Sequence, residues 1–159
     1  MALVLGACTA MAPPAVPLDG VPAAFRMAGR LSIAQDGQGE IFRLRWERSL
    51  AGDTWTVLSP VGTEVARIER LPDGVQVFRP GAAPLAAASL ADVTQALFGA
   101  DLDERLLAAW LHGRAHGGAS GWRVQIEPDA VVGPARRVVA VHGQTTVRLV
   151  VDDYEVLVP

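Results

Sequence analysis

Apolar and polar residues alternate along several short segments of this chain, and this alternation limits what it can fold into. In the first segment the apolar residues occupy odd-numbered positions: Phe25, Met27, Leu31 and Ile33. The polar residues Arg26, Arg30 and Ser32 occupy even-numbered positions. Successive side chains of a strand point to opposite faces, so the pattern predicts a strand with one buried face and one wet face. Gly29 interrupts the apolar parity, where we expect a bend or a close backbone approach.

Further strand-like segments lie on both sides of a middle region. We expect strands over residues 42–47, 54–59, 63–70 and 74–79 before that region, and over 122–127, 136–141, 145–151 and 154–158 after it. Turn residues separate many of them, at Asp36-Gly37-Gln38-Gly39, Ala51-Gly52-Asp53, Leu71-Pro72-Asp73-Gly74 and His142-Gly143-Gln144. Strands joined by such short turns pair antiparallel.

The middle region has the period of a helix. A first helix is predicted after Ser89, a good N-cap, and before Gly99, a good stop, with an apolar stripe of Leu90, Val93, Leu97 and Phe98. A second is predicted over 103–111, with acidic residues in its first turn and an apolar face of Leu106, Leu107 and Trp110. Strands on both sides of a helical insert predict an α+β fold, in which helices close one side of a strongly curved antiparallel sheet.

Charge and length exclude some classes of function. The 159 residues suffice for about one domain with a single core. Fourteen basic residues, all of them arginine, stand against seventeen acidic ones, for a net charge of −3. The arginines are dispersed and form no basic stripe along the sequence, so we expect no nucleic-acid partner.

Catalytic and metal-binding patterns are also missing from the sequence. His112 and His116 are four residues apart, but the glycines around them disfavour a helix that could present a metal-binding face. No Gly-x-Ser-x-Gly elbow accompanies any serine. We therefore expect a protein that is not an enzyme and that uses no metal and no cofactor.

The single cysteine stands after an apolar run. Leu5-Gly6-Ala7-Cys8 resembles a lipobox, the processing signal of bacterial lipoproteins, which makes Cys8 the expected site of lipidation; the alternative is an incidental cysteine in an apolar N-terminus. Only seven residues precede it and none is basic, so residues 1–7 are interpreted as a truncated signal. Residues 8–23 are rich in proline and form the expected extended tether, and the folded domain is expected over 24–159.

The order and spacing of several motifs resemble a known family. They are Leu-Gly-Ala-Cys at 5–8, Phe-Arg-Met-Ala-Gly-Arg-Leu-Ser-Ile at 25–33, Arg-Trp at 45–46, Leu-Ser-Pro-Val-Gly at 58–62, Trp-Leu-His-Gly at 110–113 and Val-Arg-Leu-Val-Val-Asp-Asp-Tyr at 147–154. Together they are similar to the outer-membrane lipoprotein receptor family LolB and, more distantly, to its carrier partner LolA. The resemblance covers nearly the whole chain.

The resemblance implies a fold and a role. The fold would be a half-open antiparallel β-barrel of about eight to ten strands under a helical lid. The role would be that of a monomeric receptor, lipid-anchored in the outer membrane and facing the periplasm, that accepts the acyl chains of lipoproteins from a LolA-like carrier and inserts them into outer-membrane lipid. A loop of Pro60, Val61 and Gly62 corresponds to the family's exposed apolar loop, which would enter the membrane.

An acyl chain requires a contiguous apolar wall. The candidate wall residues are Phe42, Leu44, Trp46, Val57, Trp110, Trp122, Val124, Leu149 and Val151. The alternative for each is a place in a closed core. Two other functions stay open at this point: a structural lipoprotein that tethers or assists an outer-membrane assembly complex, and a carrier of free lipid.

Overall fold

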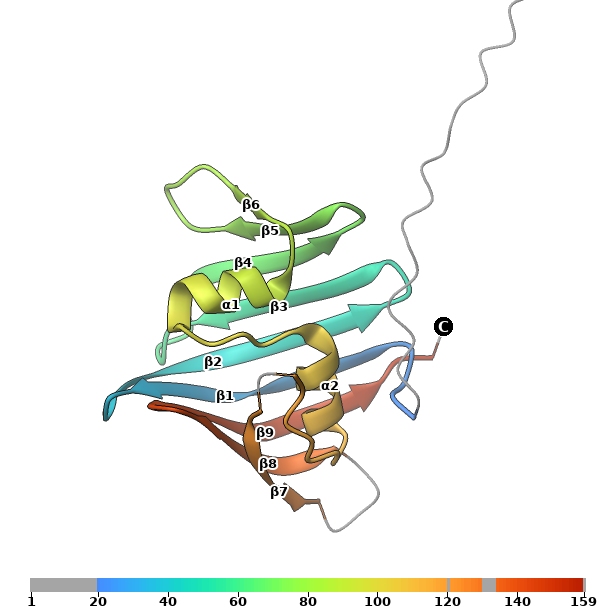
Figure 1. Ribbon diagram of the computed structural model, residues 1–159. Helices are drawn as coiled ribbons and strands as arrows, with labels where there is room; N and C mark the ends of the chain where they lie inside the picture. Colours follow the sequence, from blue (N-terminus) through green and yellow to red (C-terminus); the bar gives the residue numbers. More distant parts are fainter. Residues whose placement is uncertain (1–19, 120, 130–133, 159) are drawn as a thin grey trace, which may run out of the picture.

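The computed structural model describes residues 20–119, 121–129 and 134–158. Within them, nine strands form one antiparallel sheet and two helices lie on one of its faces (Figure 1). Cys8, residues 1–7 and most of the predicted tether fall outside the described residues.

The strands follow one another as a meander that is interrupted by the helices. The elements are β1 (Phe25–Gln35), β2 (Gln38–Ser49), β3 (Gly52–Leu58), β4 (Glu64–Leu71), β5 (Gly74–Phe78), β6 (Leu85–Ala87), α1 (Leu90–Phe98), α2 (Glu104–Leu111), β7 (Arg123–Pro128), β8 (Ala135–His142) and β9 (Thr145–Val156). Their order in the sheet is β6-β5-β4-β3-β2-β1-β9-β8-β7. The last strand therefore joins the first, which places the two halves of the chain on either side of the β1–β9 pair.

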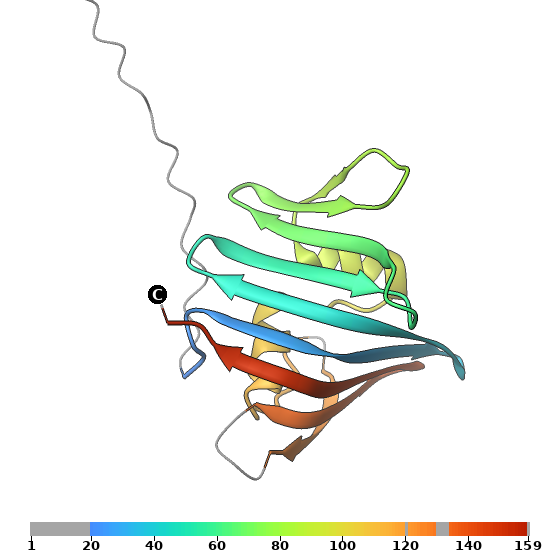
Figure 2. The same ribbon diagram turned by 180° about the vertical axis from the view of Figure 1, so that it is seen from behind.

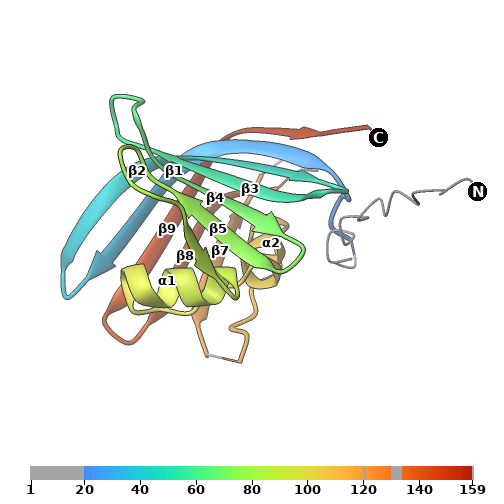
Figure 3. The same cartoon turned by 90° about the horizontal axis from the view of Figure 1, so that it is seen from above.

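The sheet is curved, and both helices lie on its concave side (Figures 1 and 3). The opposite, convex face carries no helix (Figure 2). The predicted α+β fold, with a curved antiparallel sheet and a helical insert, is thus present. The barrel is not closed in the described part of the chain, since β6 and β7 are the edges of the sheet and do not pair with each other. The chain leaves the three-residue strand β6 directly for α1, so helices take the place that further strands would need for closure.

The first strand shows why the sequence pattern predicts the sheet well. Phe25 and Met27 are fully buried on the concave side, while Arg26 and Arg30 are exposed on the other. At Gly29 the register between β1 and β9 shifts, and a Cβ atom there would collide with the backbone carbonyl oxygen of Val150. The close approach predicted at this glycine is confirmed.

One strand prediction was wrong, and one strand was missed. The chain end was expected to contain two strands, over 145–151 and 154–158, but β9 runs without a break from Thr145 to Val156. Val151 pairs with Gly29 and Asp153 pairs with Ala28, so Asp152 is the extra residue of a bulge that breaks the alternation without ending the strand. The short strand β6 was missed because Leu-Ala-Ala offers no alternation.

Both helices begin and end close to where the capping residues predict. The Ser89 side chain accepts a hydrogen bond from the backbone N–H of Asp92 at 3.1 Å, and Gly99 ends α1 with φ 65°. The Asp103 carboxylate accepts one from the N–H of Leu106 at 2.7 Å. The buried Thr94 hydroxyl of α1 accepts from the N–H of Leu102 at 2.9 Å, which fixes the connection between the helices.

Candidate binding cavity

A cavity of about 590 Å³ lies between the concave face of the sheet and the two helices. Its walls come from β1 to β6, β8, β9, α1 and α2, and most of the lining side chains are apolar. The polar side chains of the lining are Glu40, Arg79, Asp92 and Thr94. The first three of these are exposed, so the charged groups lie at the rim and the interior of the cavity is apolar.

The cavity opens at one end. The lining residues Leu85 and Leu97 are 51% and 53% exposed, and a Cβ atom at Gly99, the residue that ends α1, would meet the side chain of Gln35 at the end of β1. Glu40 lies at the start of β2, beside the turn from β1, so the mouth is at the β1–β2 turn end of the sheet. An elongated apolar ligand can enter there without crossing the sheet.

Trp46 and Trp55 form the wall near the other end. The two indoles are register partners on β2 and β3 with ring centroids 5.7 Å apart, and they are 2% and 3% exposed. Phe25 packs edge-on against Trp46 at 5.0 Å. These large aromatic rings close the space beneath the helices and give the cavity a bottom.

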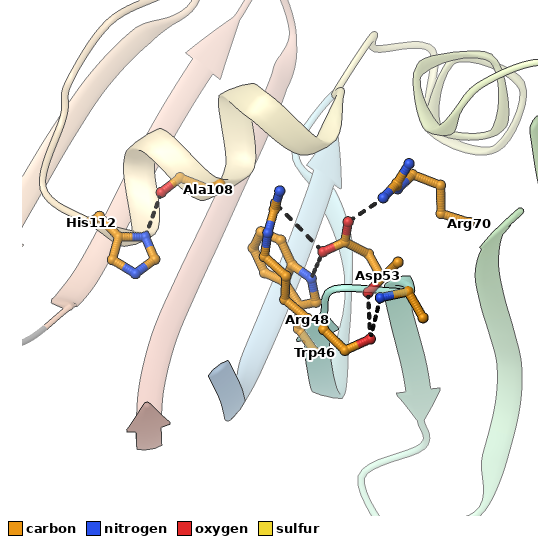
Figure 4. Close-up of polar contacts among 9 residues, drawn as sticks. Trp46, Arg48, Asp53, Arg70, Ala108 and His112 are labelled. Carbon is orange, nitrogen blue, oxygen red and sulfur yellow. Dashed lines mark hydrogen bonds and ion pairs between the residues drawn. The ribbon is translucent and has the colours of Figure 1, made fainter. Parts of the chain in front are cut away.

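A buried ionic cluster lies beside Trp46 (Figure 4). Asp53 is 2% exposed and accepts hydrogen bonds from the Trp46 indole N–H at 2.9 Å and from the Arg70 Nε at 3.2 Å. Arg48, 1% exposed, approaches the same carboxylate at 3.6 Å. One carboxylate thus holds two cations and an indole in place at the closed end.

The sequence predicts Asp53 in a turn and points to no role for Arg48. The alternation of the strands does predict that both side chains point inward. Arg48 follows Trp46 by two residues and Asp53 precedes Trp55 by two, so all four side chains lie on the same, concave face. Two opposite charges on the apolar face of adjacent strands are unusual unless they pair, since an unpaired buried charge is costly.

Six of the nine predicted wall residues are among those that line the cavity, namely Phe42, Leu44, Trp46, Val57, Trp110 and Leu149. The other three, Trp122, Val124 and Val151, are outside the lining. Trp122 packs edge-on against Trp110 at 5.6 Å, and Val124 and Val151 pack against the core. The reason is that α2, with Trp110 and the fully buried Leu111, packs on β8 and fills this half of the concave face, so these three side chains meet protein and not open space.

Further lining residues were missed by sequence reasoning. Leu31, Ile33, Ile68 and Val77 all line the cavity from neighbouring strands. Leu31 and Ile33 share the parity of Met27 on β1, so the alternation pointed to the concave face. It could not distinguish the part of that face beneath α2 from the part that stays open.

The predicted membrane loop forms the connection between β3 and β4. The Ser59 N–H donates to the Thr63 carbonyl at 2.8 Å, and the Gly62 N–H donates to the Ser59 carbonyl at 2.9 Å. These bonds fix a short loop with Pro60 and Val61 at its tip, and Val61 is 88% exposed. The loop projects from the convex side of the sheet, away from the helices (Figure 3).

The described residues show neither a metal site nor a spanning helix. No group of three or more histidine, cysteine or acidic side chains comes together in them. Neither of the two helices in this part of the chain has the length and apolar character that crossing a bilayer requires.

His112 at the end of α2 has a structural role. Its Nδ1 lies 2.8 Å from the Ala108 carbonyl oxygen, and its Nε2 lies 2.9 Å from the Tyr154 hydroxyl (Figure 4 shows the first contact). The carbonyl can only accept, so Nδ1 carries the proton and the Tyr154 hydroxyl donates to Nε2. Burial lowers the pKa of His112, and the Arg114 and Arg48 cations lower it further against the opposing effect of the Ala108 carbonyl.

We expect His112 to make the protein less stable in mild acid. The unfolded chain takes up a proton near pH 6.5 while the folded chain does not, so the stability from neutral His112 is present above pH 6.5 and is lost as the pH falls toward the lowered folded-state pKa. The slope should stay well below the ~1.4 kcal/mol per pH unit of one fully buried group, because the ring is only half-buried. Urea unfolding at pH 6.5 and 5.5 measures it. His112→Gln should reduce this slope and the exposed His116→Gln should not; equal slopes in all three proteins would contradict the assignment.

Comparison with known proteins identifies the family. The family model for the outer-membrane lipoprotein LolB matches residues 23–131. An outer-membrane lipoprotein LolB of Azoarcus sp. (strain BH72) is 30% identical over 175 residues, an alignment that covers 96% of this chain and 90% of that protein. The chain belongs to the LolB family.

Another LolB protein, from Thiobacillus denitrificans, is 32% identical over 116 residues, which is 72% of this chain and 62% of that protein. Among solved structures, a LolA superfamily protein of Nitrosomonas europaea matches with a TM-score of 0.50 and 10% identity, over 87% of this chain and 88% of that one. This likeness supports the LolA/LolB type of fold.

LolB membership assigns a location and a general role. The chain is a lipoprotein of the outer membrane, lipid-anchored and facing the periplasm, and its role is in lipoprotein localisation. The LolB family is a trafficking family and not a known family of enzymes.

Proposed function

We propose that the chain accepts the acyl chains of lipoproteins from a LolA-like periplasmic carrier into the cavity between the sheet and its helices, and then delivers them to outer-membrane lipid. The observation that carries this proposal is the cavity itself: about 590 Å³, apolar inside, open at one end and bounded by Trp46 and Trp55 near the other. An acyl chain gains about 25 cal/mol for each Å² of apolar surface that leaves water.

Burial of this kind needs no chemical energy source. Transfer proceeds from one cavity to a second when the second buries more of the acyl surface, because the free energy scales with the area removed from water. The six predicted wall residues in the lining, Phe42, Leu44, Trp46, Val57, Trp110 and Leu149, are the residues we assign to acyl contact. We assign the charged rim of Glu40 and Arg79 to the part of the cargo that stays in water.

The anchor completes the proposal. Lipid on Cys8, followed by a proline-rich tether up to residue 23, would hold the domain near the membrane surface. Two acyl chains on one cysteine suffice for stable anchoring, whereas a single chain binds only reversibly. A short tether keeps the cavity mouth within reach of both an arriving carrier and the bilayer.

The test is transfer of an acylated lipoprotein from a loaded LolA-type carrier to the full chain carrying Cys8→Ala, with no nucleotide and no membrane present. We expect the cargo to move to the receptor, and we expect the same cargo without acyl chains not to bind. If a carrier shown to be competent with another acceptor fails to load this chain, the receptor proposal is wrong and a tether for an assembly complex replaces it. Binding of free lipid alone, without loading from the carrier, would favour a lipid carrier.

We predict that Val61→Glu leaves cargo binding intact and reduces release into membranes. Burial of one valine side chain contributes about 1.5 kcal/mol, so its loss alone should slow delivery about tenfold, and the added charge should slow it further. Delivery of labelled cargo from the loaded receptor to vesicles measures this effect. Val158→Glu is the matched control, because Val158 is 92% exposed and lies near the other end of the sheet. If Val61→Glu delivers cargo as fast as the parent, the loop has no such role.

A further inference from the structure

The convex face of the sheet carries arginines that form no ion pair with any described residue. They include Arg43 and Arg45 on β2, Arg136 and Arg137 on β8, and Arg148 on β9, all of them exposed. Other arginines of the same sheet do have acidic partners: Arg26 pairs with Glu47, and Arg30 with Asp152 at 2.8 Å. This face thus carries a group of cations without an acidic partner among the described residues, although the net charge of the chain is −3.

The register of the strands brings these arginines together. Arg30 is the partner of Arg43 on one side and of Val150 on the other, and Val150 is the partner of Arg137. Arg148 lies two residues before Val150 on β9 and pairs with Ser32 of β1. Neighbouring strands are about 4.8 Å apart, so the cations of this face lie within roughly one Debye length of each other and repel one another in the free protein. Anions that bind there relieve this repulsion.

A hollow lies among these arginines. It has a volume of about 520 Å³, and Arg30, Arg136, Arg137 and Arg148 contribute to its walls. Glu127 is the single acidic residue that lines it. The guanidinium group offers two parallel N–H donors to a phosphate, so a hollow walled by several arginines suits phosphate oxygens.

Exposed apolar side chains border the same face. Ile41 lines the hollow and is 61% exposed. Arg43 is the register partner of Leu58, the last residue of β3, so the loop with Val61 begins beside this arginine. That loop projects to the convex side (Figure 3) and Figure 2 shows this side free of helices. Apolar tips and unpaired cations thus face the same direction.

We propose that this convex face binds the phosphate headgroups of anionic phospholipids, with Arg137 and Arg148 as the main contacts, while Ile41 and Val61 enter the acyl region beside them. A lipid surface fits better than an acidic protein, because a bilayer offers phosphate and hydrocarbon together and the chain is anchored at one. The inference rests on the proposed function only in using the Val61 loop as the membrane contact. It adds the lipid charge that the receptor selects and the face that it presents to the bilayer.

The test is binding of the full chain with Cys8→Ala to vesicles of phosphatidylethanolamine with and without phosphatidylglycerol. We expect binding to rise with phosphatidylglycerol and to fall with added salt. Each arginine near an anionic surface contributes about fivefold, so Arg137→Gln with Arg148→Gln should weaken binding roughly 25-fold. The matched control is Arg26→Gln with Arg105→Gln, which removes the same charge from exposed positions outside the hollow.

Three results would overturn the inference. The first is vesicle binding that does not depend on phosphatidylglycerol, and the second is an equal loss of vesicle binding in both double variants. The third is a double variant at positions 137 and 148 that binds vesicles like the parent but loads poorly from the carrier. That result would mean that this face binds a protein. The carrier assay without vesicles keeps the two proposals separable. If the parent chain fails to load there, the receptor proposal fails whatever the vesicles show. If the parent chain loads normally and the arginine substitutions do not change vesicle binding, only this inference fails.

Discussion

Asp53→Ala is expected to lose about 3–5 kcal/mol of unfolding free energy, a large share of the 5–15 kcal/mol of a typical domain. The variant removes the buried carboxylate that pairs with Arg48 and Arg70 and that accepts the hydrogen bond of the Trp46 indole N–H. Removing one partner of a buried pair is costly because the other charge stays out of water. Urea unfolding at pH 7 measures the loss.

Asp152→Ala is the control for Asp53→Ala. It breaks the exposed pair with Arg30, and exposed pairs contribute at most about 1 kcal/mol. Asp53→Asn keeps an acceptor for the indole and should lie between the two, which retains a folded variant for comparison if Asp53→Ala does not fold. An Asp53→Ala chain within about 1 kcal/mol of the parent would show that the ionic cluster does not hold the closed end together.

Val57→Trp is expected to weaken cargo binding on the order of 15- to 60-fold. Val57 is half-buried and faces the cavity from β3, so an indole there occupies space that two or three methylenes of an acyl chain would take, at about 0.8 kcal/mol each. The measurement is the equilibrium distribution of an acylated lipoprotein between the carrier and the receptor.

Thr56→Trp is the matched control for Val57→Trp. Thr56 precedes Val57 on β3, so its side chain points to the convex face, and it pairs there with Arg45 and Arg67. The same residue is added to the same strand, but outside the cavity, and cargo binding should stay within a factor of about two. Equal losses in both variants would mean that a tryptophan disturbs β3 in general and that the cavity volume does not set affinity.

The sheet and helices could be predicted from the sequence because their signals are local. Alternation in β1 and β2 gave both the strands and their buried face, and Ser89, Gly99 and Asp103 mark helix ends through hydrogen bonds to near neighbours. Prediction was wrong where a non-local pairing overrides the pattern, as at Asp152, whose bulge is fixed by β1 and not by its own neighbours.

The cavity could be predicted only in part. An inward-facing valine on β3 and one on β9 carry the same sequence signal, yet Val57 lines the cavity and Val151 packs against the core. The difference depends on where α2 lies over the sheet, which is a property of the tertiary fold. The ionic cluster of Arg48 and Asp53 is similar, because it becomes meaningful only when β2 and β3 are paired in register.

The most direct measurement of whether the cavity holds acyl chains is photo-crosslinking. A photoreactive amino acid replaces Leu44, which lines the cavity, or its neighbour Arg45, which is exposed on the convex face, and each chain is incubated with a carrier loaded with acylated lipoprotein. We predict crosslinks to the acylated cargo from position 44 and not from position 45, and no crosslinks to cargo that lacks acyl chains. Crosslinks of equal strength from both positions, or transfer of cargo without any crosslink from position 44, would contradict it.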